Sequence, residues 1–379
     1  MIALSSASYS FENLYRTYKD WMGNIYSDDI MQSNYFISQM GFDSIPPDMI
    51  DSTVIEEAKS GGSSNSSFMR EYAAQFTDGS DSYFSAKKMH ACTIPDGEKQ
   101  HTLVKGEPDK EYILAIDPSF SNSPSSDFFA MSILELDEER PTFSTLVHGY
   151  AVAGGNLKDH IKYLYYLVTN FKFSMIIIDN AGYQFIDSAN ESELFQSSRI
   201  EIKFFDFNSD KNGVDYDKML LTAKRQYNKK ENVICFKQLF STTFLREANE
   251  HLQASIDHQR IWFASRAAAC GSFFDKVSAQ AVPIKLMPYE NKGDLIEFQD
   301  DIVHQSKKQC ALVEVKTTAK GTQTFDLPQH LKRSTAANRA RKDNYTTLML
   351  GNWAVKSYND IKNTKVQQVN HTFTPRMIA

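Results

Sequence analysis

Cysteine is scarce in this sequence of 379 residues, and no two cysteines lie close together. The four are Cys92, Cys235, Cys270 and Cys310. Their spacing excludes a Cys-x-x-Cys zinc knuckle or redox pair, and predicts buried, reduced thiols instead. A G-x-x-x-x-G-K-[ST] phosphate loop is missing as well. We therefore expect no ATP-binding site, and no ATPase activity from this chain alone.

Long apolar runs and positive net charge are also missing. No run approaches the roughly 18–20 apolar residues that span a bilayer, so we expect no membrane partner. The first residues, MIALSSASYS, have no basic region and no long apolar stretch, so no signal peptide is expected. The formal net charge is −6, which disfavours general coating of nucleic acid. The composition, 41% hydrophobic and 23% charged, is that of a globular protein with a sizeable core.

The length favours two domains, and the composition places a boundary between them near residues 105–110. Residues 10–22 have the spacing of an amphipathic helix. The stretch SGGSSNSS at 60–67 is typical of a flexible linker. We predict a smaller, mostly helical region over 1–108 and a larger α/β domain over 109–379.

The larger domain begins with three strands and then alternates helices with strands. The apolar runs predict strands at 111–117, 127–137, 143–153, 174–179 and 201–207, and helices at 156–171, with Asn156 as N-cap, and at 183–197. The order β-β-β-α-β-α-β, with a short hairpin link after the second strand, predicts a ribonuclease H-like mixed sheet. A doubly wound sheet would alternate strands and helices from its start.

The rest of the chain is predicted to add helices and one hairpin. The helices are expected at 215–229, 240–256, 294–310 and 343–358, a short strand at 260–264, and the hairpin at 311–327 with its turn at Ala319–Gly321.

Two aspartates end apolar strands that this topology places side by side. Asp117 closes YILAID and Asp179 closes SMIIID. Two carboxylates about 4 Å apart repel by roughly 4 kcal/mol at an effective dielectric of 20. No Lys or Arg adjoins either strand end in sequence, so a divalent metal ion is the natural neutraliser. Oxygen ligands favour Mg²⁺ or Mn²⁺ over zinc.

Asp343 is the third candidate, and it opens the last predicted helix. An acid in a first helical turn is favourable in itself, because it faces unpaired N–H groups and the positive end of the dipole. A helix cap is therefore the alternative interpretation. Three cations precede it closely in RARKD, and cations beside a metal-binding acid suit a polyanionic ligand.

Other charged residues are weaker candidates for the metal site or for DNA binding. Asp127, at the start of the second strand, either supports the metal site or simply begins a strand. Asp300 and Asp301 lie in the middle of a helix and are interpreted as a solvent-exposed face. Residues 332–342 hold five cations and no acid, so they form either a solvated loop or a DNA-binding segment. The five are Lys332, Arg333, Arg339, Arg341 and Lys342.

These motifs resemble the large terminase subunit of tailed bacteriophages. ILAIDPSFSNSPSSDFFAMSIL, MIIIDNAG and RKDNYTTLMLGNWA are similar to the three segments that carry the family's nuclease acids. The resemblance places those acids at Asp117, Asp179 and Asp343. It implies an endonuclease that cuts double-stranded viral DNA during genome packaging and uses two Mg²⁺ or Mn²⁺ ions.

The N-terminal part is similar to the end of the same family's motor domain. Ser6-Ala7-Ser8 stands where the family has its coupling triplet, and residues 68–92 resemble the stretch leading into the nuclease. The nucleotide-binding half of the motor has no counterpart. The resemblance implies a portal protein and a small terminase subunit as partners, and action in the cytoplasm of an infected bacterial host. The missing half leaves two interpretations: the sequence is part of a longer chain, or a separate ATPase chain is a further partner.

Two other functions remain open from the sequence. The chain could be a non-catalytic coupling module that binds DNA and docks the motor onto a portal ring. It could also be a resolvase or transposase of the same fold, for which branched DNA or transposon ends would be preferred over plain duplex.

Overall fold

The computed structural model describes most of the chain. It covers residues 7, 13–26, 35–49, 51–60, 65–76, 82–98, 100–121, 123, 126–206, 231–269, 271–281, 289, 291–317, 323–327 and 340–371. The chain forms two compact units, Met1–Ala91 with Ala311–Val315, and Cys92–Cys310 with Lys316–Ala379. The assignment of 1–108 to a motor remnant and 109–379 to a nuclease stays a prediction.

The smaller unit is mostly helical, as expected. Its helices are α1 (Asn13–Ile25), α2 (Ser52–Ser60), α3 (Asn65–Glu71) and α4 (Ala86–Ala91). Aromatic side chains pack against one another within it. The ring centroids of Tyr15 and Tyr18 lie 5.1 and 4.8 Å from that of Phe76, and Phe42 packs edge to face on Phe68.

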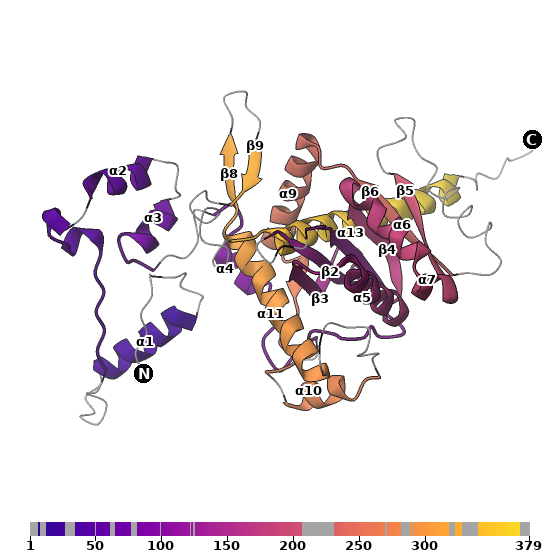
Figure 1. The fold of residues 1–379 in the computed structure, drawn as a ribbon, viewed down its shortest axis with the longest axis horizontal. Helices are drawn as coiled ribbons and strands as arrows, with labels where there is room; N and C mark the ends of the chain where they lie inside the picture. The colour runs from indigo at the N-terminus through magenta and orange to yellow at the C-terminus, as the bar shows by residue number, and fades with distance from the viewer. Residues whose placement is uncertain are drawn as a thin grey trace, which may run out of the picture. The chain divides into compact units, whose positions relative to one another are not determined.

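The larger unit is built on one seven-stranded sheet of order β5-β6-β4-β1-β2-β3-β7 (Figure 1). The strands are β1 (Tyr112–Asp117), β2 (Phe128–Leu136), β3 (Ser144–Ala153), β4 (Phe173–Asp179), β5 (Ile200–Asp206), β6 (Glu231–Gln238) and β7 (Ile261–Phe263). The first three are antiparallel neighbours, and β4 then joins β1 in parallel. This confirms the predicted ribonuclease H-like mixed sheet.

Strand β6 is absent from the sequence-based prediction. It inserts between β4 and β5, parallel to both. Its apolar run, VICF, has only four residues between polar neighbours, so the sequence signal is short. The helix predicted just before it, at 215–229, lies outside the described residues.

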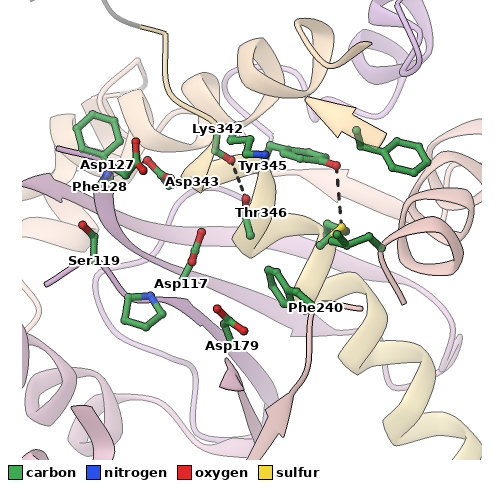
Figure 2. A pocket seen from close by; sticks show the side chains of 14 residues that line it. Asp117, Ser119, Asp127, Phe128, Asp179, Phe240, Lys342, Asp343, Tyr345 and Thr346 are labelled. Carbon is green, nitrogen blue, oxygen red and sulfur yellow. Dashed lines mark hydrogen bonds between the residues drawn. The ribbon is translucent and has the colours of Figure 1, made fainter. Parts of the chain in front are cut away.

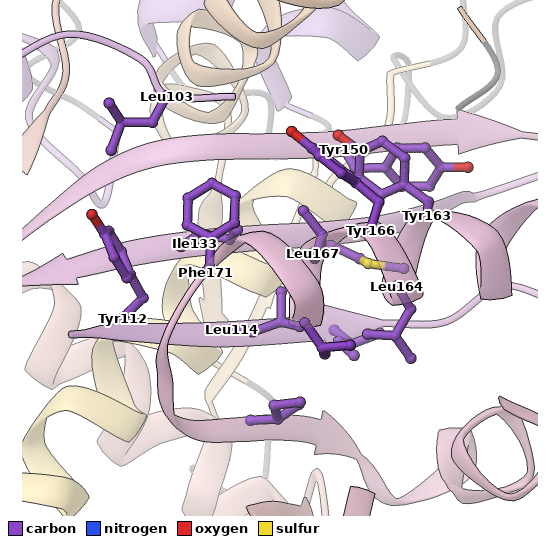
Figure 3. Packing of buried hydrophobic residues seen from close by; sticks show 14 of the residues in the cluster. Leu103, Tyr112, Leu114, Ile133, Tyr150, Tyr163, Leu164, Tyr166, Leu167 and Phe171 are labelled. Carbon is purple, nitrogen blue, oxygen red and sulfur yellow. The ribbon is translucent and has the colours of Figure 1, made fainter. Parts of the chain in front are cut away.

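Helices cover both faces of the sheet. On one face α5 (Leu157–Asn170) packs Tyr163, Leu164 and Leu167 over strand residues that include Leu114 (Figure 3). Burying each such side chain stabilises the fold by about 1.5–3 kcal/mol. The predicted N-cap is confirmed, since the Asn156 side chain accepts a hydrogen bond from the Asp159 N–H.

The last helix, α13 (Asp343–His371), crosses the other face and contacts β1 and β2. Its Gly351 is needed for that approach. A Cβ there would lie 2.5 Å from Leu134 Cδ1 and 3.4 Å from Ala115 Cβ. The helix therefore sits directly on the strand that ends in Asp117.

Two further expectations are corrected. The helix predicted at 183–197 is two helices, α6 (Tyr183–Glu191) and α7 (Glu193–Ser197), because the extended backbone of Ser192 ends one and its side chain caps the next. Asp300 is buried rather than solvent-exposed. It lies on α11 (Lys292–Ala311) and accepts hydrogen bonds from Thr102 and from two backbone N–H groups.

The remaining elements include α9 (Thr242–Asp257), α10 (Gly271–Ser278) and the strand pair β8 (Glu314–Thr317) and β9 (Gln323–Asp326). The predicted turn at 319–321 lies outside the described residues. The described cysteines are free and buried, as expected. Among the helices that the structure describes, none is long and apolar enough to cross a bilayer.

Candidate active site

Asp117 and Asp179 stand at the same edge of the sheet because their strands are parallel neighbours. Ile116 of β1 pairs with Ile178 of β4, so the two acids follow at the next position of each strand. Neighbouring strands lie about 4.8 Å apart. In-register residues of adjacent strands share a face, and Asp117 shares its face with Ala115, beneath α13.

Asp343 reaches this edge from a distant part of the sequence. It is the first residue of α13, and the helix is fixed over the sheet by a hydroxyl contact of 2.6 Å between Thr347 and Ser132. Its Oδ2 accepts a hydrogen bond of 2.8 Å from the Phe128 N–H at the start of β2. The side chain is only 7% exposed. Asp343 thus ties two elements together as well as facing the edge where β1 ends.

One cavity of about 330 Å³ gathers these acids together with Asp127. Figure 2 shows Asp117 between Asp179 on one side and Asp127 and Asp343 on the other. The acids come from the ends of two strands, the start of a third and the start of a helix. The structure therefore brings together all four acidic residues proposed from the sequence.

Burial disfavours ionisation of Asp117, Asp179 and Asp343, and like charge adds to this effect at Asp117 and Asp343. The pKa of Asp117 is raised well above its ordinary value, first by burial and then by the charges of Asp343 and Asp179, with Lys342 acting against them. Burial raises the pKa of Asp343 to about 6, against the opposing hydrogen bond from Phe128. Burial also raises the pKa of Asp179. A cation in the cavity would relieve this repulsion.

Two of the five predicted DNA-binding cations are described, and both lie beside the acids. Lys342 lines the cavity and pairs with Asp326 at 3.1 Å. Arg341 donates from Nε to the Ser126 carbonyl at 2.9 Å and stacks over the Phe128 ring at 4.4 Å. Lys332, Arg333 and Arg339 lie outside the described residues.

The donor set fits a hard divalent cation. All four side chains are carboxylates, which Mg²⁺ and Mn²⁺ prefer as ligands. Within the part of the chain that is described, no three His, Cys, Asp or Glu side chains already have the arrangement of a metal site. The carboxylates of Asp117, Asp179 and Asp343 would therefore have to draw together around an ion.

Sequence reasoning missed the apolar side chains that line the same cavity, here called the apolar wall. It is formed by Phe240, Leu245, Phe325, Tyr345 and Met349. These side chains come from the end of β6, α9, β9 and α13, and no local pattern in the sequence links them.

No protein-family model and no curated protein matches the sequence. Several solved structures are similar. The match to the large terminase nuclease from thermophilic phage G20c has 12% sequence identity and a TM-score of 0.36, and covers 71% of this chain and 96% of that one. The match to the nuclease domain of the Sf6 large terminase subunit has 9% identity and a TM-score of 0.34, and covers 72% of this chain and 98% of that one. The match to the HK97 bacteriophage large terminase has 10% sequence identity and a TM-score of 0.36, and covers 80% of this chain and 50% of that one. All three are large terminases or their nuclease domains, the family that the sequence motifs resemble.

Proposed function

We propose that this chain is a metal-dependent endonuclease that cuts double-stranded DNA, as the nuclease of a phage packaging terminase. The observation that carries the proposal is the meeting of Asp117, Asp127, Asp179 and Asp343 in one cavity at the edge of the sheet. Similar structures of other terminase nucleases were solved with bound magnesium or with manganese.

Asp117, Asp179 and Asp343 are proposed to hold two Mg²⁺ or Mn²⁺ ions, with Asp127 in support. Such ions, when bound, stabilise the attacking and leaving oxygens of a phosphodiester. Asp117 is the central ligand in this scheme, because the charges of the other three acids all act on it. Burial of Asp117, Asp179 and Asp343 reduces the screening of their charges by bulk water, so the cavity favours a cation.

Arg341 and Lys342 are proposed to bind phosphates of the DNA backbone, together with Lys332, Arg333 and Arg339. Backbone contacts of this kind orient the duplex without reading its sequence. The Arg341 guanidinium is already oriented, by its bond to the Ser126 carbonyl and its stacking on Phe128.

Proposed partners follow from the same family. They are a portal protein, a small terminase subunit and an ATPase chain, with the cytoplasm of an infected bacterium as the place of action. This chain spans half the length of the HK97 large terminase, and it contains no phosphate loop.

The test is plasmid cleavage by the purified chain with Mn²⁺, compared with the same reaction in EDTA. We expect nicked and linear products only with the metal ion, and their loss in the Asp117→Ala protein. Undiminished cutting by that variant would refute the proposed site. DNA binding without any cutting would favour the coupling module. Cleavage of branched DNA in strong preference to plain duplex would favour a resolvase.

A further inference from the structure

The cavity has two chemically different walls, and the proposed cleavage of DNA uses only one of them. One is the set of acids, and the other is the apolar wall, which contains Phe240, Leu245 and Phe325. A phosphate group and its metal ions gain nothing from such a surface, because removing charge from water beside apolar groups is costly. The apolar wall therefore suits another part of the substrate.

Exposed apolar side chains of the larger unit gather around the same edge. Among its described residues, the large hydrophobic side chains that are exposed are Phe120, Leu157, Tyr183 and Leu239. They follow the ends of β1, β3, β4 and β6. These four strands are mutually parallel, so their carboxyl ends lie at one edge of the sheet. Apolar surface gathered at one place marks a binding site more often than scattered residues do.

Aromatic rings at this edge are combined with positive charge. Phe120 is 51% exposed, and the Tyr183 ring has the Lys237 ammonium 5.4 Å from its centre. Phe240 is held by stacking on Phe244 at 5.4 Å, and it is partly exposed to the cavity. Aromatic faces beside cations are the usual platform for nucleobases that have left the duplex stack.

We infer that the apolar wall receives an unstacked nucleobase of the strand that is cut, with Phe240 as its stacking partner. The inference rests on the proposed nuclease function and adds a substrate class to it: DNA that is unpaired or distorted at the scissile phosphate. A cavity of about 330 Å³ lies at the small end of ligand pockets, which suits one base rather than a stacked duplex. Matched duplex is cut more slowly, because a base must first leave its stack.

The experiment compares two labelled duplexes of one sequence, one fully matched and one with a central unpaired bubble, cut in Mn²⁺. We expect the wild-type protein to cut the bubble about tenfold faster. Loss of one stacking contact, worth about 1–3 kcal/mol, lowers binding about 5- to 150-fold. Phe240→Ala should therefore reduce bubble cleavage about tenfold and bring it near the matched rate. Phe240→Trp should retain the preference.

Two controls separate stacking from folding. Phe240→Leu keeps an apolar side chain on Phe244 but lacks a ring face, so it should fold normally and still lose the preference. Glu139→Ala removes an exposed side chain at the opposite end of the central strands, away from this cavity, and should change neither rate. A 2-aminopurine base in the bubble gives a second readout, since its fluorescence should fall on binding to Asp117→Asn protein and not to the Asp117→Asn, Phe240→Leu double variant.

The inference is overturned if wild-type protein cuts both duplexes equally and Phe240→Leu cuts the bubble as wild type does. In that case the metal-dependent cutting itself would still stand. If no DNA is cut in Mn²⁺, the proposed nuclease function is wrong, and the inference about the nucleobase falls with it.

Discussion

Two acidic cavities lie at opposite ends of the central strands, and their carboxylates differ in the hydrogen bonds that they accept. The proposed active site is at the end of β1, at Asp117. The other, of about 670 Å³, includes Glu135 and Asp137 and lies near the start of the same strand, since Glu135 pairs with Tyr112. Both place acids in partly buried positions, so composition alone does not distinguish them.

Hydrogen-bond donors distinguish the two cavities. Glu135 lies 3.4 Å from the Tyr112 hydroxyl and 3.3 Å from Gln100 Nε2, each of which donates to it. Asp137 accepts two bonds from the Arg140 guanidinium and two from backbone N–H groups. By contrast, no described residue donates a hydrogen bond to the Asp117 carboxylate, which faces three other acids. A buried acid with donors holds structure, and one without them needs a cation from outside.

The largest expected effect contrasts one acid from each cavity. Asp117→Asn should lower the rate of Mn²⁺-dependent DNA cleavage at least about 100-fold, because a metal ligand matters more than the outer contacts that cost 10–100-fold. Glu135→Gln should cleave within about twofold of wild type, since it lies at the other end of the strand. Equal losses in both variants, measured as initial rates of nicking, would remove the distinction between the cavities.

Metal binding at the Asp117 cavity should stabilise the folded protein, and we expect no metal binding at the Glu135 cavity. A ligand at 100 times its Kd stabilises the folded state by about 2.7 kcal/mol. Mn²⁺ should therefore raise the Tm of the wild-type protein and of Glu135→Gln, and leave that of Asp117→Asn nearly unchanged. Calorimetric scans with and without EDTA measure this directly. A rise that survives in Asp117→Asn would place the ion somewhere else.

Without metal, the same substitutions should act in opposite directions on stability. Asp117→Asn removes a carboxyl group whose ionisation is disfavoured by burial and by three like charges, and should raise the free energy of unfolding by about 1–2 kcal/mol at neutral pH. Glu135→Ala removes the acceptor of the Tyr112 hydroxyl and one of the two acceptors of Gln100 Nε2, and should lower the free energy of unfolding by about 1–2 kcal/mol. Urea unfolding in EDTA gives both values. Destabilisation by Asp117→Asn would mean that its carboxylate has a structural partner after all.

How much of this could be predicted from the sequence depends on how local each signal is. Asp117 and Asp179 follow unbroken apolar runs, so their place at strand ends was readable from the pattern. Asp343 opens a helix, but only the packing of α13 at Gly351 carries it to the same cavity. That packing joins segments more than 200 residues apart, and family resemblance rather than periodicity pointed to it.

The errors have the same physical origin. Asp300 was placed on an exposed helix face because helical spacing does not reveal a loop that covers the helix. Its donors, Thr102 and the backbone at Ala267, come from two other segments. The apolar wall was missed for this reason too, since Phe240 and Phe325 become neighbours only in the folded chain.

The smallest expected effect extends the comparison from buried acids to a buried base. Burial lowers the pKa of His160 to about 4, and its Nδ1 lies 2.8 Å from the Tyr150 hydroxyl. Between pH 6.5 and 4 the unfolded chain binds a proton at this site that the folded chain does not. Acid therefore destabilises the fold here, by about 1.4 kcal/mol per pH unit at most.

His160→Gln isolates this contribution, because the buried acids titrate equally in both proteins. The wild-type protein should lose about 1 kcal/mol more stability than the variant between pH 7 and pH 5.5, as measured by urea unfolding. Parallel losses in the two proteins would show that His160 keeps an ordinary pKa. The buried acids have raised pKa values and oppose this trend, since they take up protons in the folded state. The wild-type curve alone therefore understates the effect, and only the difference between the two proteins reports the histidine.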